Sequence, residues 1–399
     1  MNREPVVITG LGVLSALGPD LQAFAAGLRS GRTGIRRMTL FDASDCRSEL
    51  AGECAEPSFA SSLTLPSRTS RPDRFGLRAA LDAVADAGLS PEKLTGAGLI
   101  FGTGTGGAAD TEDYLRQLLA GGLGAPGQLI SHQPSAVTDL VARVLGLRGP
   151  RSTVMTACSS SALAISQARD LIQLGRAPIM LAGGAEGLCR LTSAGFGALR
   201  ATSPELCRPF DVDRKGLNLG EGAAVLVLES ESHARRRGAR IHARLLGSGL
   251  TCDAHHMTAP HPEGEGALRA MRLALTDAAL GPEALGYINA HGTGTPHNDA
   301  AESTAVSRLL GERRRAVPMS SIKSMVGHTL GAAGAIEAVA SVVALTHGFL
   351  PPTVNLMTPD PAFDLDFIPG AAREQQVDVV LSSSFAFGGN NAALLFGRA

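Results

Sequence analysis

The chain repeats part of its own sequence, and that repeat limits the possible folds more strongly than any other feature. Residues 77–94 read LRAALDAVADAGLSPEKL, and residues 268–285 read LRAMRLALTDAALGPEAL, with ten of eighteen positions identical. Each copy leads through an apolar stretch to the tetrapeptide GTGT, at 102–105 and at 292–295. We interpret this as a duplication, because a helix, a strand and a turn recur in the same order.

Weaker similarities extend the duplication over most of the chain. They pair the apolar segments 162–174 and 333–345, and the segments 220–229 and 388–397. A polar stretch near residue 240 separates the copies. The sequence therefore predicts an N-terminal half at residues 1–240 and a C-terminal half at residues 241–399.

Strands and helices alternate within each half, which predicts an α/β protein. The strands expected at 6–9, 99–101 and 179–182 are apolar on both faces, as in sheets that helices cover. The helices at 162–174 and 332–346 carry too few charges for a surface position. We therefore expect five layers, α/β/α/β/α, with central helices between two sheets.

Composition and charge exclude several classes of protein. The 399 residues carry a formal net charge of −1, no Trp and two Tyr, so we expect no nucleic-acid surface and no membrane-interface belt. The apolar stretch 332–350 contains Glu337 and His347, which predicts a buried helix and not a membrane span. No secretory h-region follows Met1, and six scattered cysteines predict reduced thiols in the cytoplasm.

Cys158 is the candidate nucleophile. It lies in the sequence TACSSS, between a strand-like run and an apolar helix. A thiol at the start of a helix is near the positive end of the helix dipole, which favours the thiolate. A free cysteine is more often a small buried apolar residue. That alternative stays open for Cys158 and is favoured for the other five cysteines.

Two histidines in glycine-rich turns are candidates for the same site. His291 precedes the second GTGT sequence, and His328 lies in GHTLG, before the apolar helix of the C-terminal half. A single buried histidine is usually structural. Two histidines in such turns, in the half that duplicates the one carrying Cys158, favour catalysis.

Lys323 and Glu337 form a second candidate pair. Glu337 interrupts an otherwise apolar helix. An unpaired carboxylate there would lower the stability of the fold by several kcal/mol. Lys323, in the sequence SIKS, is the nearest candidate partner. The pair is either purely structural or adjusts the charge beside the thiol.

Two motifs suggest other functions, and we consider both weak. Residues 102–107 read GTGTGG and fit a dinucleotide-binding pattern, but no acidic residue follows at the expected distance. His255, His256 and His261 with Asp253 are the right residue types for zinc, but they lack the usual ligand spacing. We therefore expect neither a nucleotide nor a metal.

Taken together, these residues resemble the β-ketoacyl-acyl carrier protein synthases of the thiolase superfamily, in the discrete type II, synthase II-like form. The resemblance runs from TGLG at residues 9–12 to FGGN at 387–390. Its specific blocks are TACSSS at 156–161, RPFD at 208–211, GEG at 220–222, NAHGTGT at 289–295 and KSMVGH at 323–328. It implies a thiolase fold and a decarboxylative Claisen condensation of malonyl-acyl carrier protein with a cysteine-bound acyl chain.

The resemblance also implies the roles of the reacting groups. Cys158 would take the acyl chain as a thioester, with an oxyanion hole formed by the backbone N–H groups of Cys158 and Phe387. His291 and His328 would stabilise the enolate that forms when the malonyl group loses CO2. No metal and no redox cofactor are implied.

Further residues have supporting roles by the same resemblance. Thr293 and Thr295 would contact the pantetheine arm, and Lys323 with Glu337 would set the electrostatics around His328. A gate would include Ala386 and Gly388 beside Phe387. Ala386 stands where similar fatty-acid enzymes commonly have glycine, which indicates altered gating, because alanine rarely adopts positive φ.

The resemblance leaves the pathway and the partner open. CSSS and HGTGT resemble polyketide enzymes, whereas MVGH and DAHHMT resemble fatty-acid enzymes. We favour secondary metabolism with a reduced or polyene chain, and housekeeping fatty-acid elongation is the alternative. A non-catalytic, chain-length-factor-like subunit is a further alternative, although such chains typically lack the nucleophile. The implied partners are an acyl carrier protein and a second subunit, identical or a chain-length factor, bound along the strand at 179–182.

Overall fold

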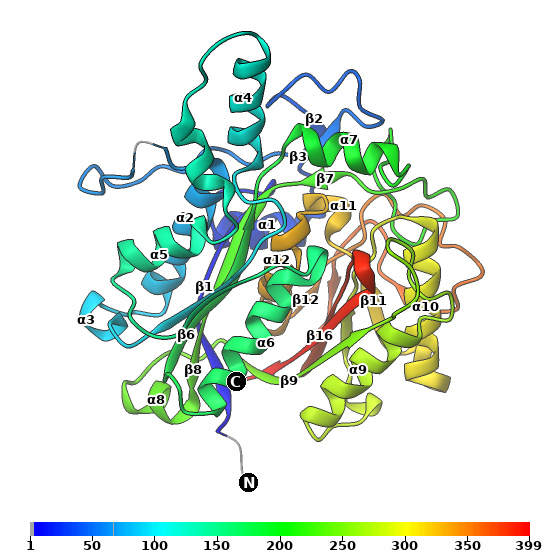
Figure 1. Ribbon diagram of the computed structural model, residues 1–399. Coiled ribbons are helices and arrows are strands. Elements are labelled where there is room, and N and C mark those ends of the chain that lie inside the picture. Colours follow the sequence, from blue (N-terminus) through cyan, green and yellow to red (C-terminus); the bar gives the residue numbers. More distant parts are fainter. Residues whose placement is uncertain (1–3, 67) are drawn as a thin grey trace.

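The computed structural model describes residues 4–66 and 68–399 (Figure 1). The N-terminal half contains β1 (Val6–Leu14), α1 (Leu21–Ser30), β2 (Ile35–Arg37), β3 (Leu50–Gly52), α2 (Arg71–Asp86), α3 (Pro91–Leu94), β4 (Gly98–Gly102), α4 (Ala108–Leu119), η1 (Pro126–His132), α5 (Ala136–Leu145), β5 (Arg151–Val154), η2 (Ala157–Ser159), α6 (Ser160–Gln173), β6 (Ile179–Glu186), α7 (Arg190–Ala198), β7 (Leu219–Gly220), β8 (Gly222–Ser230) and α8 (Glu231–Arg236).

The C-terminal half contains β9 (Ala243–Cys252), α9 (Glu265–Asp277), η3 (Pro282–Ala284), β10 (Tyr287–Asn289), α10 (Pro296–Leu310), η4 (Gly311–Arg315), β11 (Pro318–Ser320), α11 (Lys323–Val326), η5 (Leu330–Ala332), α12 (Ala333–His347), β12 (Phe349–Leu350), β13 (Asp366–Phe367), β14 (Arg373–Glu374), β15 (Val379–Phe385), η6 (Phe387–Gly389) and β16 (Asn390–Arg398). The η elements are short 3-10 helices.

The strand order confirms the duplication. Eleven strands form the order β13-β11-β10-β15-β16-β9-β1-β8-β6-β4-β5, which repeats itself outward from β9 and β1. In each half the two inner pairings are antiparallel and the outer pairings are parallel, two in the N-terminal half and three in the C-terminal half, where β13 is added. The repeated helix of the sequence is α2 in one half and α9 in the other, and each packs on its own half of the sheet.

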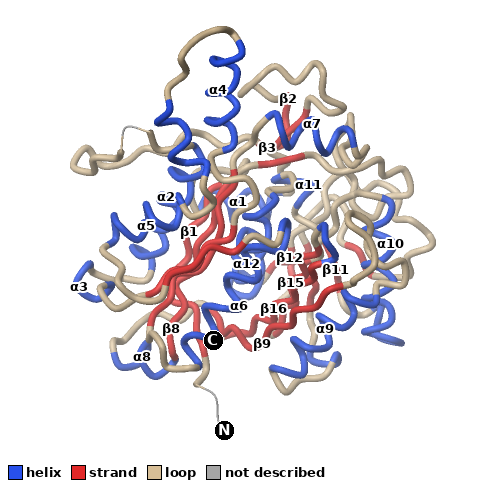
Figure 2. Tube along the Cα trace, viewed as in Figure 1, coloured by secondary structure: helices blue, strands red, loops and turns tan. Residues whose placement is uncertain are grey.

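The two predicted sheets are in fact one sheet. Strands β1 and β9 pair antiparallel over three residues, Val6 to Ile8, and this short seam joins the half-sheets into a single curved sheet (Figure 2). The prediction of two separate sheets was wrong at this point. The sequence does not reveal the seam, because Val6–Leu14 is apolar apart from Thr9 and is equally suited to a central or an edge position.

The five layers are present around that sheet. The helices α6 and α12 contact strands of both halves and share one central core with them. On the outer faces, α2 and α5 cover the N-terminal half-sheet, and α9 and α10 form the core of the C-terminal half. The layer order is therefore α/β/α/β/α, as in the thiolase fold.

Helices α6 and α12 pack closely because small residues face each other. A Cβ placed on Gly334 would lie 2.8 Å from the Cβ and the backbone nitrogen of Ala162, so only glycine permits this approach. The segment Leu330–His347 is long and apolar enough to cross a membrane, but 89% of it is buried inside the protein. It is the expected buried helix, and its ends place site residues between the half-sheets.

The predicted dimer contact along residues 179–182 was wrong. These residues belong to β6, which pairs with β4 on one side and β8 on the other and is fully buried. The strand at the end of the sheet in this half is β5, whose Arg151 and Ser152 are exposed. A second chain can extend the sheet only along such a free edge.

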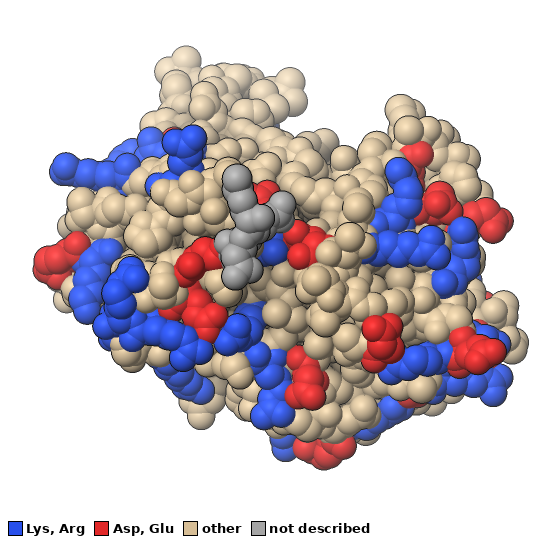
Figure 3. All heavy atoms as spheres, turned by 90° about the horizontal axis from the view of Figure 1, so that it is seen from below, with Lys and Arg blue, Asp and Glu red and all other residues tan. Residues whose placement is uncertain are grey.

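Charges of both signs are interspersed on the lower face of the molecule (Figure 3). The basic run at residues 235–237 illustrates this arrangement, because Arg235 pairs with Glu231 and Arg237 with the buried Glu229. Arg314 and Arg315 in η4 both pair with Asp364. Four of the six arginines in these two runs thus pair with neighbouring carboxylates.

Candidate active site

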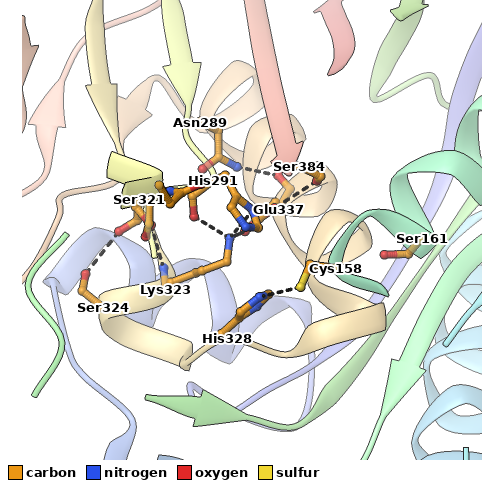
Figure 4. A network of polar contacts seen from close by, with 12 residues as sticks. Cys158, Ser161, Asn289, His291, Ser321, Lys323, Ser324, His328, Glu337 and Ser384 are labelled. Atoms are coloured by element: carbon orange, nitrogen blue, oxygen red, sulfur yellow. Dashed lines mark hydrogen bonds and ion pairs between the residues drawn. The ribbon is translucent and has the colours of Figure 1, made fainter. Parts of the chain in front are cut away.

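Cys158 and His328 come from different halves and meet at the centre of the molecule (Figure 4). Cys158 lies in η2, between β5 and α6, and His328 lies between α11 and η5. The Sγ atom of Cys158 is 3.0 Å from Nε2 of His328. Both residues are buried. The structure thus brings the candidate nucleophile and a candidate base within hydrogen-bond reach.

The thiol of Cys158 is protonated in this arrangement. Burial raises its pKa to about 12, against the opposing effects of the Lys323 charge and a backbone hydrogen bond from Phe387. The sequence-based expectation of a thiolate at a helix start is therefore outweighed by desolvation. A protonated thiol donates to the neutral ring of His328, which can accept the proton when the sulfur attacks.

The ring of His328 is neutral as well. Burial lowers its pKa well below the usual value, and the Lys323 charge lowers it further. The backbone N–H of His328 donates to the carbonyl of Asn218 at 2.7 Å, and its carbonyl accepts from Gly220 at 3.0 Å. Its Nδ1 atom is buried and has no hydrogen-bond partner among the residues that the structure describes. The backbone, rather than a second hydrogen bond, therefore sets the ring position.

His291 is the second histidine of the site and is held by Lys323. The ammonium of Lys323 lies 3.2 Å from Nδ1 of His291 and 2.6 Å from its carbonyl oxygen. An ammonium can only donate, so Nδ1 accepts and the ring proton resides on Nε2. The rings of His291 and His328 meet edge to face with centroids 5.4 Å apart. His291 therefore offers an N–H donor beside His328.

Glu337 is the partner of Lys323. The carboxylate of Glu337 in α12 accepts from the ammonium of Lys323, and Ser384 of β15 lies 3.5 Å from its other oxygen. Both side chains of the ion pair are almost completely buried. Burial raises the pKa of Glu337 to about 7, against the effect of the Lys323 charge. The three ammonium hydrogens of Lys323 thus have three acceptors, namely Nδ1 and the carbonyl of His291 and the carboxylate of Glu337. These contacts fix the ammonium beside His291.

A cavity of about 490 Å³ opens onto this group. Its wall includes Cys158, both histidines, and the predicted pantetheine contacts Thr293 and Thr295. The hydroxyls of the two threonines lie 2.9 Å apart at the start of α10. Lys323 and Glu337 do not line the cavity, so they act on the site only through their neighbours. The wall is largely apolar, with a few polar groups around the thiol, which suits a long apolar substrate.

The predicted gate residues lie beside the thiol. Ala386 and Phe387 line the cavity, and the ring of Phe387 stacks on Phe196 of α7 with centroids 5.4 Å apart. Ala386 has φ −134° and ψ 154°, an extended conformation that any residue adopts. Gly388 and Gly389 instead have φ of 82° and 76°, so the turn requires glycine there and not at 386.

Two buried carboxylates near the site were missed by the sequence analysis. Glu302 accepts the backbone N–H groups of His291 and Gly292, both at 2.8 Å, and burial raises its pKa to about 8. Its position on the apolar face of α10, three and four residues before Ala305 and Val306, could have revealed it. Glu186 accepts from the GTGT turn after β4. No pattern in the sequence indicates that second contact.

The two weak motifs do not form sites. The backbone N–H groups of Gly104 and Thr105, which would face a nucleotide phosphate, both donate to Glu186. His256 accepts two backbone N–H groups at Nδ1, and His261 accepts the backbone N–H of Glu263 at Nδ1. The rings of His255 and His261 meet edge to face. No group of three metal-ligating side chains occurs in residues 4–66 and 68–399.

Comparison with known families agrees with this geometry. The chain matches the family described as "Beta-ketoacyl synthase, N-terminal domain" over residues 3–234 and its "C-terminal domain" over residues 242–357. Together these matches cover most of the chain, including Cys158, His291 and His328.

The chain belongs to the β-ketoacyl synthase family. A 3-oxoacyl-(acyl-carrier-protein) synthase 2 from Synechocystis sp. is 42% identical over 99% of this chain and 98% of the relative. A putative polyketide beta-ketoacyl synthase 1 from Streptomyces halstedii is also 42% identical, again over 99% of this chain and 98% of the relative. A solved structure, the ishigamide ketosynthase/chain length factor, is 40% identical, covers both chains completely and superposes with a TM-score of 0.95.

Membership in this family makes the protein an acyltransferase-type enzyme. The equal identity to the two named relatives means that overall similarity does not separate fatty-acid from polyketide ketosynthases.

Proposed function

We propose that the protein is a 3-oxoacyl-acyl carrier protein synthase that joins a cysteine-bound acyl chain to a malonyl unit with loss of CO2. The observation that carries this proposal is the contact between the Cys158 thiol and His328, beside His291, at the wall of one largely apolar cavity. A thiol, a proton acceptor and a second N–H donor are the groups that a decarboxylating Claisen condensation needs.

The first half-reaction loads the acyl chain. The Cys158 sulfur attacks the thioester carbonyl of an acyl-acyl carrier protein, and its proton moves to Nε2 of His328, 3.0 Å away. Backbone N–H groups of Cys158 and Phe387 stabilise the tetrahedral oxyanion. When the intermediate collapses, the carrier thiolate leaves and takes the proton from His328. The products are acyl-Cys158 and the free carrier thiol.

The second half-reaction forms the carbon–carbon bond. A malonyl-acyl carrier protein loses its carboxylate as CO2, and the electrons of the broken bond form an enolate. Acylated Cys158 no longer donates to His328, so the neutral ring carries its proton on Nε2 in this half-reaction. The Nε2–H groups of His291 and His328 donate to the enolate oxygen, and Lys323 keeps the His291 proton on Nε2. The enolate carbon attacks acyl-Cys158 and expels its thiolate, which gives 3-oxoacyl-acyl carrier protein. The thiolate then takes one proton from water, which restores the thiol. Neither step requires a metal or a redox cofactor, and we propose none.

A mass-spectrometric experiment tests this function. Incubation with an acyl-acyl carrier protein should add the acyl mass to the peptide that contains Cys158, and later addition of malonyl-acyl carrier protein should remove it as product. A chain without adduct on Cys158 would instead be a non-catalytic chain-length-factor-like subunit. The intact thiol and both histidines speak against that alternative.

We also propose a second chain of the same fold as partner. The helix α4 projects from the body of the molecule (Figure 1) and exposes Leu119 by 88%, while Leu123 just beyond it is 93% exposed. Through η1 and α5 this region is connected to the free edge of β5. Exposed apolar side chains and a free strand edge are each typical of a subunit interface. A chain-length factor is the partner that we favour, and a second copy is the alternative.

Sedimentation distinguishes the two partners. The isolated chain should be monomeric if it needs a chain-length factor, and it should be a dimer if it pairs with itself. We place the enzyme in the cytoplasm, because all six cysteines lie in the described part of the chain and are free thiols.

The pathway follows from the acyl chains that the enzyme accepts. We propose type II polyketide biosynthesis, with housekeeping fatty-acid elongation as the alternative. Acyl-acyl carrier proteins of graded length and unsaturation separate the two. Efficient elongation of long saturated chains with rejection of polyenoyl chains would assign the enzyme to fatty-acid synthesis.

A further inference from the structure

Glu186 is a buried carboxylate that the proposed mechanism leaves without a role. It ends β6 and has no measurable exposure. Its oxygens accept the backbone N–H groups of Gly104 at 2.7 Å, Thr105 at 3.0 Å and Gly331 at 3.0 Å, and also the hydroxyl of Thr105. Gly104 and Thr105 belong to the N-terminal half and Gly331 to the C-terminal half. One carboxylate therefore ties the two halves together.

The C-terminal anchor of this carboxylate lies three residues beyond His328. Gly331 is the middle residue of η5, and the preceding Leu330 has φ 45°. A left-handed conformation costs a leucine about 1–2 kcal/mol, so surrounding contacts must hold it. A Cβ on Gly331 would lie 2.4 Å from the nitrogen of Gly104, which shows how closely this turn packs on the GTGT backbone.

His328 depends on such backbone anchors more than His291 does. The ring of His291 is held at Nδ1 by Lys323, whereas Nδ1 of His328 has no partner in the described part of the chain. Hydrogen bonds to Asn218 and Gly220 hold the N–H and the carbonyl of His328 itself. On the C-terminal side, the first side chain that holds the backbone is Glu186, through Gly331.

We propose that Glu186 is a positioning residue for His328. Its carboxylate fixes the strained turn at residues 330–331 against the GTGT turn of the other half, and so keeps Nε2 of His328 within hydrogen-bond distance of the Cys158 sulfur. The inference rests on the proposed function, because it assigns His328 and Cys158 to the chemistry. A neutral amide at 186 has the same shape but presents an NH2 group to at least one backbone N–H group.

The variant Glu186→Gln tests this role. Two measurements report on the His328–Cys158 contact: the pH dependence of Cys158 alkylation by iodoacetamide, followed on its peptide, and the steady-state kinetics of condensation. We expect the midpoint of alkylation to move to higher pH. We also expect kcat to fall about 10- to 100-fold while KM for acyl-acyl carrier protein stays nearly constant, because a small displacement of a catalytic group has effects of this size.

Glu229→Gln is the matched control. Glu229 is equally buried, pairs with the opposite end of β6 through Ile179, and holds Thr9 and Arg237 far from the thiol. This variant should keep the alkylation profile and kcat of the original chain. An alkylation profile of folded Glu186→Gln that superposes on that of the original chain would overturn the proposal.

A milder variant keeps the test decisive if Glu186→Gln does not fold. Thr105→Val removes one hydrogen bond to the carboxylate and leaves its charge in place. It should move the alkylation midpoint in the same direction by a smaller amount, and an unchanged midpoint would contradict the role of Glu186. Failure of the proposed function would look different, since the original chain itself would then form no acyl adduct on Cys158.

Discussion

The two halves enter their central helices through related turns that differ in chemistry. The first junction, residues 155–161, leads from β5 through η2 into α6, and the second junction, residues 321–334, leads from β11 through η5 into α12. In both, a non-glycine residue with positive φ opens the 3-10 turn, Ala157 at 51° and Leu330 at 45°. The backbone frame of the duplication is therefore retained.

The side chains at the two junctions are not retained. The residue after Ala157 is the thiol of Cys158, whereas the residue after Leu330 is Gly331, where a Cβ would collide with the backbone of Gly104. Two residues separate β5 from η2, but nine separate β11 from η5, and the longer connection carries Lys323 and His328. The extra length of the second junction thus supplies the groups that act on the thiol of the first.

The ends of β6 and β15 differ in the same way. Both strands occupy the same place in their half-sheets, and they end at Glu186 and Phe385. The Glu186 side chain accepts a hydrogen bond from the backbone N–H of Gly331 at the second junction. The loop after Phe385, in contrast, leaves Cys158 open to the cavity. One junction is thus closed by a carboxylate of the protein, and the other is free for a substrate carbonyl.

The largest effect is expected when the Cys158 thiol, which only the first junction has, is removed. Cys158→Ala should lower condensation by at least about 10³-fold, because no other group can form the acyl thioester. Product formation and the acyl adduct should disappear together. Cys46→Ala, a free cysteine outside the cavity, should keep both, and full condensation by Cys158→Ala would remove the thiol from the mechanism.

Removal of the Lys323–Glu337 ion pair tests whether the longer connection at the second junction contributes to activity. Lys323→Met leaves Glu337 buried without its cation, and should lower the free energy of unfolding by about 3–5 kcal/mol. Condensation should fall about 100-fold, because His291 loses the ammonium that fixes its tautomer. The double variant Lys323→Met/Glu337→Gln should regain stability but not activity. Recovery of activity would show that the pair has only a structural role.

A side chain on Gly331 tests whether the junctions are interchangeable. Gly331→Ala forces a Cβ against the backbone nitrogen of Gly104 and should lower the free energy of unfolding by about 1–3 kcal/mol or more. Cys158→Ala should change it much less, because a side chain already occupies that position. Chemical denaturation of both variants measures the contrast, and equal losses would mean that both turns tolerate the same side chains.

We predict that the free energy of unfolding depends on pH because of the buried carboxyl group of Glu302 in the C-terminal half. Burial raises the pKa of Glu302 to about 8, so the folded chain retains a proton that the unfolded chain releases above about pH 4.5. Its contribution is therefore complete at low pH and is lost as pH rises through 8. Denaturation midpoints should fall between pH 6 and pH 9, and Glu302→Gln should show a shallower fall. An equally steep fall in Glu302→Gln would assign the effect to other groups.

The smallest effect is expected at Ala386. Its extended backbone is compatible with alanine, so Ala386→Gly should cost about 0.5–1 kcal/mol of stability through the greater freedom of the unfolded chain. The rate of acyl transfer to Cys158 should change more than that, because glycine gives the gate access to positive φ. Stopped loading reactions measure this rate, and an unchanged rate would show that Gly388 and Gly389 alone provide the motion.

The sequence predicted which residues form the site better than it predicted their protonation and their contacts. The repeat, the isolated Glu337 in an apolar helix and the two histidines in glycine turns all indicated groups that the fold brings together. The protonation of Cys158 was not predictable, since the apolar residues that bury it come from segments as distant as Leu217 and Leu330. The contact of Glu186 with Gly331 spans 145 residues and has no local signal.

The fold shows the same division between local pattern and distant pairing. Helix α2 was predictable from its apolar spacing, and Ser70 caps it in the local pattern with Asp73. The position of β6 in the interior of the sheet was not predictable, because its neighbours β4 and β8 are also apolar. Strand order depends on pairing between distant segments, and such pairing is not encoded in the composition of a single strand.

The distance along the chain between thiol and imidazole has a consequence during synthesis. Cys158 and His328 are 170 residues apart, so a ribosome exposes the thiol long before the imidazole is made. Under the proposed mechanism, a nascent chain that ends before β9 holds the acyl acceptor without either histidine. Such a chain cannot draw acyl groups from the carrier pool by this chemistry. Translation itself therefore delays the first turnover until the polypeptide includes His291 and His328.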